Sequence, residues 1–403
     1  MKETYLDYSS TTPTRKEVLK SAIPYFNEKF GNPSSFHSTG LVAKKTILEA
    51  RTRIAKILGT KSEEIIFSGS GTESINLALK GIAFREMLAG KRGVFITQRT
   101  EHHAIIETLH WLEKIGFSVL YAKIDDTGTV DLKDLEKLLI ENKGKVLLVS
   151  IMYANNEIGT IQPLREISNL CHTHGTILHT DACQGAEYLN LNVNELGVDM
   201  MTLNGSKVYA FKGTGLLYKK QEVKIEPLIH GGAHEFGLRA GTENVPGIIA
   251  LATALTLAEK EKKKESARLV KLRDYMIKKI GKEIPQTILN GHSKNRLPNN
   301  VNISFIGVEG ESILLRLNEA GVRVSTGSAC SSQSLDPSHV LIGIGRTHGV
   351  AHGSIRFSLG KETTKKQIDY TIKVLKEIIK FLRQISPVWK KQEWKRQIKE
   401  KGE

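Results

Sequence analysis

The chain has 403 residues, 40% of them hydrophobic, which is enough for a large buried core and more than one ordinary domain holds. No run of about 18 apolar residues occurs and the first residues contain no apolar signal region, so we expect neither a membrane span nor a leader. The net charge of +15 comes mainly from dispersed lysines, which solvated helix faces explain better than a nucleic-acid partner.

The first 244 residues alternate between strand-like and helix-like stretches. Residues 6–14 are extended, strands are expected at 64–67, 94–97, 117–122, 145–152, 176–180 and from 198, and helices at 41–58, 73–84, 103–115 and 164–174. This alternation predicts right-handed crossover units and a mostly parallel sheet that is buried on both faces.

The remaining residues have a different character. A long lysine-rich helix is expected from 248 to about 284, where it would bridge two domains. Strands at 301–305, 321–325 and 354–359 and helices at 311–320 and 365–382 follow it. They predict a smaller second domain of the α+β class.

Two polar residues are expected at the ends of neighbouring buried strands. Asp181 ends the strand at 176–180, and Lys207 follows the next strand after a short polar turn. A desolvated lysine can attack a carbonyl, and a carboxylate can keep a pyridinium nitrogen protonated, so the pair favours a pyridoxal phosphate site. A solvated lysine and a helix-capping aspartate are the alternatives.

Other candidate residues lie in the same layer of strand ends. The run Ser-Gly-Ser-Gly-Thr at 68–72 joins a strand to a helix, where backbone N–H groups can bind a phosphate or form a simple capped turn. His102 could stack on a flat cofactor ring, and Asn155 could bind a cofactor oxygen or a substrate carboxylate. Each residue alone has an ordinary structural alternative.

The three cysteines differ in their surroundings. Cys171, Cys183 and Cys330 lie far apart, which argues against a disulfide framework and for a reducing compartment, so we expect a cytoplasmic protein, or an organelle-matrix one if the source is eukaryotic. Cys330 lies in a loop of Gly, Ala and Ser, where a thiol can react. Arg356 alternates with apolar residues on a strand, which suits a grip on a carboxylate or an internal salt bridge.

With these stretches assembled, the chain resembles the cysteine desulfurases, pyridoxal phosphate enzymes of the class-V aminotransferase group, and in particular the branch that serves iron–sulfur cluster assembly. The matching runs are Leu-Asp-Tyr-Ser-Ser-Thr-Thr-Pro at 6–13, Gly-Asn-Pro-Ser-Ser at 31–35, Ser-Gly-Ser-Gly-Thr-Glu-Ser at 68–74, Thr-Glu-His at 100–102, Asn-Asn-Glu-Ile-Gly at 155–159, Arg-Ala-Gly-Thr-Glu-Asn at 239–244, Ser-Thr-Gly-Ser-Ala-Cys at 325–330 and Ser-Ile-Arg-Phe-Ser-Leu-Gly at 354–360.

The resemblance implies the aspartate-aminotransferase-like fold, with a mostly parallel seven-stranded sheet in a large domain at 15–257. Residues 1–14 and 258–403 would form the small domain, which carries Cys330 and the C-terminal tail. It also implies a homodimer.

The resemblance implies a role for each candidate. Lys207 binds the cofactor through a Schiff base. The cofactor phosphate is contacted by Gly71, Thr72, Asn204 and Ser206, and Thr242 reaches the phosphate of the partner subunit. Asp181 binds the ring nitrogen, Gln184 binds the ring oxygen, His102 stacks on the ring, and Asn155 is a further cofactor contact. The catalytic residues are Lys207, His102 and Cys330. Asn155 and Arg356 hold the substrate carboxylate. No metal belongs to the site itself, although Cys330 can ligate a transferred cluster.

Four positions depart from the family pattern. Ser206 stands where the family usually has His, Asn204 where Ser or Thr is common, Phe236 where Arg is common, and Ala-Phe-Lys-Gly at 210–213 replaces Gly-Pro-Lys-Gly. All four lie at the expected rim of the cofactor, so we expect weaker cofactor binding rather than altered chemistry.

Three readings follow. In the first, the chain converts L-cysteine to alanine and a persulfide on Cys330, and the persulfide sulfur is passed to acceptor proteins for cluster assembly and tRNA thiolation. In the second, it acts as a selenocysteine lyase. In the third, it is a non-catalytic, partner-dependent scaffold. Trp389 and Trp394 lie in a basic tail that we expect to dock an iron–sulfur scaffold protein, with a frayed end as the alternative. We expect no contact with nucleic acid or a membrane.

Overall fold

The computed structural model describes residues 3–326, 336–391 and 394. Its largest feature is a seven-stranded sheet in which every strand except β8 points the same way. In spatial order the strands are β2 (Ile65–Ser68), β8 (Gly215–Lys219), β7 (Met200–Asn204), β6 (Ile177–Asp181), β5 (Val146–Ser150), β3 (Val94–Gln98) and β4 (Ser118–Ala122). The prediction of a mostly parallel, seven-stranded sheet is confirmed.

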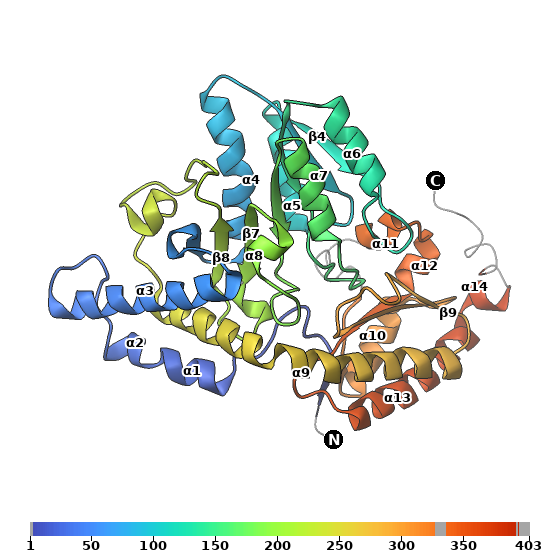
Figure 1. The fold of residues 1–403 in the computed structure, drawn as a ribbon. Helices are drawn as coiled ribbons and strands as arrows, with labels where there is room; N and C mark the ends of the chain where they lie inside the picture. The colour runs from blue at the N-terminus through green and yellow to red at the C-terminus, as the bar shows by residue number, and fades with distance from the viewer. Residues whose placement is uncertain (1–2, 327–335, 392–393, 395–403) are drawn as a thin grey trace.

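Helices cover both faces of this sheet (Figure 1). Alternate residues of one strand enter different cores: Val94 and Ile96 join one buried cluster and Phe95 joins the other. The first cluster contains residues of α1 (Lys16–Ala22), α3 (Ser38–Leu58), α6 (Leu132–Glu141), α7 (Leu164–Thr173), α8 (Val193–Leu196) and the first half of α9 (Val245–Glu283). The second contains residues of α4 (Gly71–Leu88) and α5 (His103–Lys114).

A separate core lies around a three-stranded antiparallel sheet. Its strands are, in spatial order, β12 (Ser354–Ser358), β10 (Asn300–Phe305) and β9 (Thr287–Leu289). Residues of α10 (Gly310–Glu319), α13 (Lys365–Ile385) and the second half of α9 pack on it, and Leu6 joins them from the N-terminal stretch. The N-terminal β1 (Thr4–Tyr5) pairs with β11 (Val322–Arg323). The domain division at residue 257 stays a prediction.

Helix α9 runs under both sheets as one continuous helix (Figure 1). It contributes Leu251 and Leu255 to the first core and Leu269, Met276 and Ile280 to the core of the smaller sheet. At 3.6 residues per turn these five residues fall on one face of the helix, so a single apolar stripe serves both cores.

Several elements escaped the sequence analysis. Helix α6 begins at its cap Asp131 and buries Leu135 and Leu139. The shorter α2 (Pro24–Asn27), α11 (His339–Gly343) and α12 (His348–His352) were also missed. The structure further shows that Pro387 opens α14 (Pro387–Lys390), so the tail residues that follow α13 begin as a helical turn.

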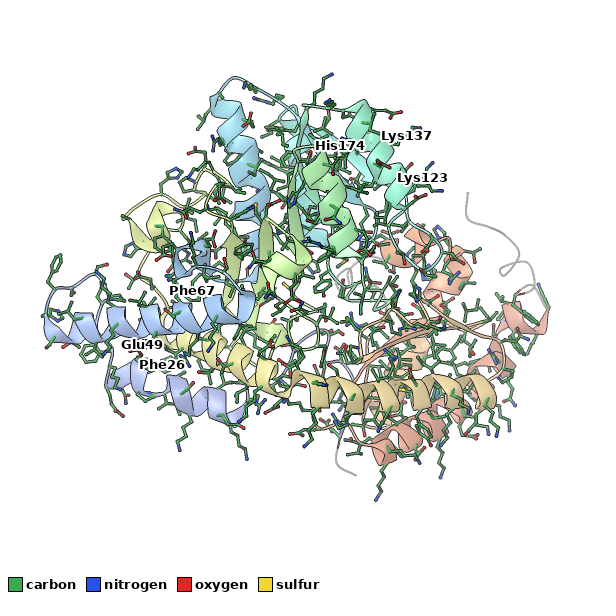
Figure 2. All side chains as sticks on the ribbon, in the orientation of Figure 1. Phe26, Glu49, Phe67, Lys123, Lys137 and His174 are labelled. Carbon is green, nitrogen blue, oxygen red and sulfur yellow. The ribbon has the colours of Figure 1, made fainter. Side chains whose placement is uncertain are left out.

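The positive charge is spread over exposed helix faces. Figure 2 shows Lys123 and Lys137 at the edge of the molecule beside α6, and their side chains are 77% and 66% exposed. No helix within the described ranges is long and apolar enough to span a membrane.

Candidate functional site

A cavity of about 210 Å³ lies where β6 and β7 end and α4 begins. Ligands of open α/β sheets bind at this carboxyl edge. Among the predicted residues, the cavity is lined by Gly71, Thr72, His102, Asp181, Gln184, Asn204, Lys207 and Arg356. The fold thus brings together eight residues that the sequence places as much as 285 positions apart.

Lys207 enters the cavity from a short 3₁₀ turn that directly follows β7. Asn204 shapes this turn, since its Oδ1 accepts the N–H of Ser206 at 3.3 Å. The lysine Nζ donates a hydrogen bond to the carbonyl of Ser10. The amine is therefore held at the cavity wall by the N-terminal stretch of the chain.

Asp181 is the last residue of β6 and is 6% exposed. Its Oδ1 accepts the N–H of Cys183 at 2.9 Å, which fixes the carboxylate at the strand end. Gln184 donates from Nε2 to the carbonyl of Ser9 at 2.9 Å. Burial raises the pKa of the Cys183 thiol, so this second thiol on the cavity wall stays protonated and is a poor nucleophile.

His102 caps the N-terminus of α5. Its Nδ1 accepts the N–H of Ala104 at 3.0 Å, so the neutral ring carries its proton on Nε2. Burial lowers the pKa of His102, against the opposing effect of Asp181. The ring at the cavity is therefore neutral at physiological pH.

The N-terminus of α4 forms another part of the wall. Ser70, not Thr72, caps this helix, and its hydroxyl accepts the N–H of Glu73 at 3.1 Å. A Cβ added to Gly71 would lie 3.0 Å from the Cys183 sulfur and 3.2 Å from the Asn204 Cβ, so the close approach of this backbone requires glycine. The unpaired N–H groups of the first turn lie at the cavity, where they suit an anion.

Arg356 crosses from the smaller sheet to the far side of the cavity. Its Nη2 donates to Asp7 at 3.0 Å and to Ser10 at 2.7 Å, and its Nη1 donates to the carbonyl of Asn156 at 3.1 Å. The internal salt bridge considered in the sequence analysis is thus present. However, the buried Nε has no hydrogen-bond partner among the described residues, so the guanidinium still has a donor for a ligand.

The side chain of Asn155 is bonded to the backbone beside this cavity. Its Nδ2 donates to the carbonyl of Thr100 at 2.8 Å, and its Oδ1 accepts the N–H groups of Glu157 and Ile158 at 2.8 and 2.9 Å. These bonds with the backbone use the side chain to hold the turn after β5. The neighbouring Asn156 lines the cavity, and the expected contact from Asn155 stays a prediction.

Three other candidates lie elsewhere. Ser206 is absent from the cavity lining, and its carbonyl accepts the N–H of Thr12 at 2.9 Å. Thr242 lines a second cavity of about 180 Å³ with Ser68 and Gly69. Cys330 lies outside the described residues.

The sequence analysis gave no role to Ser9, Ser10 and Asp7, although they belong to a run that it quoted. Ser9 and Ser10 line the cavity, and Asp7 is the ion-pair partner of Arg356. The isolated bridge between Asp7 and Ser358 brings this stretch to the site. Only the resemblance of the whole run could have indicated them.

The wall of this cavity fits pyridoxal phosphate. Lys207 supplies an amine for the aldehyde, Asp181 a carboxylate for the ring nitrogen, and α4 its N–H groups for the phosphate. The buried hydroxyl of Ser9 and the Nε of Arg356 lack hydrogen-bond partners within the described ranges, which leaves polar groups to receive a ligand. Such a site defines a pyridoxal phosphate enzyme, in which the cofactor withdraws electrons from an amino-acid substrate.

Comparisons with known proteins agree with this class. Residues 4–371 match the family model described as aminotransferase class-V. Cysteine desulfurase IscS of Dictyoglomus turgidum is 52% identical, over 98% of each chain, and cysteine desulfurase IscS of Clostridium botulinum is 46% identical over 96% of this chain and 97% of that protein. A solved structure of a NifS-like protein has a TM-score of 0.88 at 36% identity, covering 94% of this chain and 100% of its own.

The chain therefore belongs to the class-V aminotransferase family and, within it, to the pyridoxal phosphate-dependent cysteine desulfurases. The resemblance noted in the sequence is confirmed.

Proposed function

We propose that this enzyme removes sulfur from L-cysteine through the residues of the cavity at the sheet edge, releases L-alanine and keeps the sulfur as a persulfide on Cys330. The observation that carries the proposal is the convergence of Lys207, Asp181 and His102 on one cavity that Arg356 closes from the opposite side. An amine, a carboxylate and a neutral imidazole around one cavity are the groups that this chemistry needs.

We assign the roles as follows. Lys207 binds the cofactor and moves the Cα proton of the substrate, and Asp181 keeps the ring nitrogen protonated. His102, neutral because it is buried, stacks on the ring, and Gln184 binds the ring oxygen. Gly71, Thr72 and Asn204 surround the phosphate, while Ser206 is a weaker candidate because its side chain is off the cavity lining.

Arg356 and Asn155 hold the substrate carboxylate, with Asn156 beside them on the cavity lining. The Cys330 thiolate then attacks the substrate sulfur: an S–S bond forms, the C–S bond breaks, and its electron pair goes to the carbon, which takes up a proton to give alanine. No external oxidant or reductant is needed, because the substrate carbon gains the two electrons that the two sulfur atoms lose.

A thiol-trapping experiment tests the assignment of Cys330. With L-cysteine, Cys330→Ser should still change the cofactor absorbance but yield no persulfide by alkylation and mass spectrometry, while Cys171→Ser, a buried cysteine of α7, should behave as wild type. Persulfide on Cys183 in the Cys330→Ser variant would show that the wrong thiol was chosen. A strong preference for selenocysteine would favour the lyase reading.

We also propose that the active form is a cytoplasmic homodimer in which Thr242 reaches the cofactor phosphate of the partner subunit. Thr242 is exposed on its own chain and lies off the cavity of Lys207, which supports a role toward another copy. Dilution that separates the subunits should release cofactor from wild type; unchanged retention in the monomer would contradict this role.

Sulfur would pass to acceptor proteins for iron–sulfur cluster assembly, which we propose dock near the C-terminal tail. Trp389 stacks on Trp394 with ring centroids 5.3 Å apart, and the Arg383 guanidinium lies 4.1 Å from the centre of the Trp389 ring. Reversing the charge of Lys390 and Lys391 leaves this packing in place. It should weaken acceptor binding in a salt-dependent way without changing alanine formation; unaltered binding would contradict docking here.

A further inference from the structure

The first turn of α4 separates two cavities. Gly71 and Thr72 line the cavity of Lys207, whereas Ser68 and Gly69 line the second cavity, together with Arg239. A change in charge on either side of this turn therefore acts on the backbone that faces the expected cofactor phosphate.

Glu73 lies in this same turn, and its carboxylate is held at both oxygens. Oε2 accepts the N–H of Gly69 at 2.9 Å, and Oε1 accepts the Nε–H of Arg239 at 2.9 Å. The two charged side chains are about one-quarter exposed, at 26% for Glu73 and 27% for Arg239. The carboxylate thus ties the loop before α4 to the segment that carries Arg239.

The charge of Glu73 presents an electrostatic problem. A carboxylate in the first turn suits the helix dipole, but it repels a phosphate dianion that binds at the same turn. A glutamate is tolerated there if a cation neutralises it. Arg239 is that cation, and its ion pair with Glu73 points the two charges at each other instead of at the cavity.

A buried clamp places the segment that carries Arg239. Glu235 accepts two hydrogen bonds from Arg51, at 2.8 and 2.6 Å, and one from the N–H of Phe67 at 2.8 Å. The Arg51 guanidinium lies between the rings of Phe67, labelled in Figure 2, and Phe236, 4.6 and 5.0 Å from their centres.

These contacts hold Glu235 and Phe236 at φ values of 46° and 60°, a left-handed conformation that is strained for residues other than glycine. The three hydrogen bonds accepted by Glu235 fix the conformation of this strained backbone. Arg239 follows three residues after Phe236, so the position of its backbone is fixed by the same contacts.

We propose that Arg239 is a positioning residue for the cofactor phosphate, acting by neutralising Glu73 and not by contact with the phosphate; this rests on the proposed function, in which pyridoxal phosphate binds at the N-terminus of α4. The departure at position 206 makes this compensation more important, since Ser206 cannot carry the positive charge that a histidine could. Arg239 thus sets how strongly this chain retains its cofactor.

The test compares dissociation constants for pyridoxal phosphate and for pyridoxal, which lacks the phosphate, on the cofactor-stripped protein. Arg239→Gln should weaken binding of pyridoxal phosphate roughly tenfold and leave pyridoxal nearly unchanged, because only the dianion is repelled. Glu73→Gln should change neither constant by more than about threefold, and the double variant Glu73→Gln/Arg239→Gln should recover most of the lost affinity. Arg53→Gln, an exposed arginine of α3, is the matched control.

Other outcomes overturn the proposal. A double variant as weak as Arg239→Gln would mean that Arg239 contacts the phosphate directly, and equal losses for both ligands would mean that it acts only on local folding. If Arg239→Gln does not fold, Arg239→Lys keeps the charge and should retain affinity within about threefold; a tenfold loss in that variant would contradict charge compensation. Wild-type protein that binds neither ligand would instead refute the proposed cofactor site itself.

Discussion

The two walls of the Lys207 cavity are built in different ways. On the sheet wall, Asp181 ends β6 and Lys207 lies three residues after β7, so short local turns place both groups. On the far wall, Ser10 and Arg356 come from chain segments 346 residues apart, joined by hydrogen bonds and by the pairing of Asp7 with Ser358. The sheet wall holds the groups expected to do chemistry, and the far wall holds the groups expected to select the substrate.

This difference indicates that catalysis and substrate binding can be changed separately. The sheet wall depends on the parallel sheet and its two helix layers, whereas the far wall depends on the packing of the smaller sheet and the N-terminal stretch. Substitutions on the first should lower kcat, and substitutions on the second should change KM.

Lys207→Ala should have the largest effect, because it removes the amine on the sheet wall. Alanine formation should fall by roughly a thousandfold or more, and the purified variant should lack the visible absorbance of covalently bound cofactor. The measurement is an alanine assay together with an absorbance spectrum. Near-normal turnover would mean that the sheet wall does not contain the reactive amine.

Arg356→Lys should change the far wall alone. A lysine cannot reproduce the planar fork, so KM for cysteine should rise roughly ten- to a hundredfold, while kcat and the cofactor spectrum change little. Steady-state kinetics with a spectrum of the same sample separates the two effects. An unchanged KM would show that Arg356 serves only its ion pair with Asp7.

Asp7→Asn should lower KM for cysteine, which is a smaller effect than that of Arg356→Lys and opposite in sign. Asparagine keeps the Oδ1 acceptor for Arg356 and Ser10 but removes the charge that competes with an anionic substrate. KM should therefore fall about two- to threefold, the range of a partly exposed ion pair. A rise in KM would mean that the charge of Asp7 is needed to orient the guanidinium.

Glu101→Gln should have the smallest effect on activity, because it acts on stability alone. Glu101 is fully buried behind the sheet wall, where its Oε1 accepts hydrogen bonds from Gln98 and from the N–H of Met152, and burial raises its pKa from 4.5 to about 8. Between these values the folded state keeps a proton that the unfolded state loses, so stability falls as pH rises, by about 1.4 kcal/mol per pH unit.

The variant should lack this contribution, because glutamine does not titrate. Relative to wild type, its urea midpoint should therefore increase steadily from pH 5 to pH 8. The difference in urea midpoint between the two proteins excludes the contributions of Glu157 and Glu187, because both proteins contain them. Burial raises the pKa values of these two carboxyl groups to about 7. A constant difference would show that Glu101 is ionised in the folded protein.

The sheet wall could be predicted from the sequence because its signals are local. Apolar runs define the strands, and polar residues directly after them mark the edge where Asp181 and Lys207 meet. Helix α6 had such a signal too, in Asp131 and the leucines that follow it, and was simply missed.

Most of the far wall had no local signal, apart from Arg356 as a charged residue on an apolar strand. Ser10 and Asp7 acquire their positions from pairing across the whole chain, which no short pattern records. Asn155 and Asn156 are chemically identical neighbours, and no sequence pattern shows that the Asn155 side chain holds the turn after β5. A resemblance identifies such a run but does not say which of its residues turns inward.

Helix α9 has a consequence for how the protein unfolds. At 1.5 Å per residue its 39 residues span about 58 Å, and most of the stability of such a helix comes from the packing of its apolar residues. Each half is stable because a core covers it, and each core loses part of its own packing if the helix frays. The helix therefore couples the two cores, and we expect loss of structure in one of them to destabilise the other.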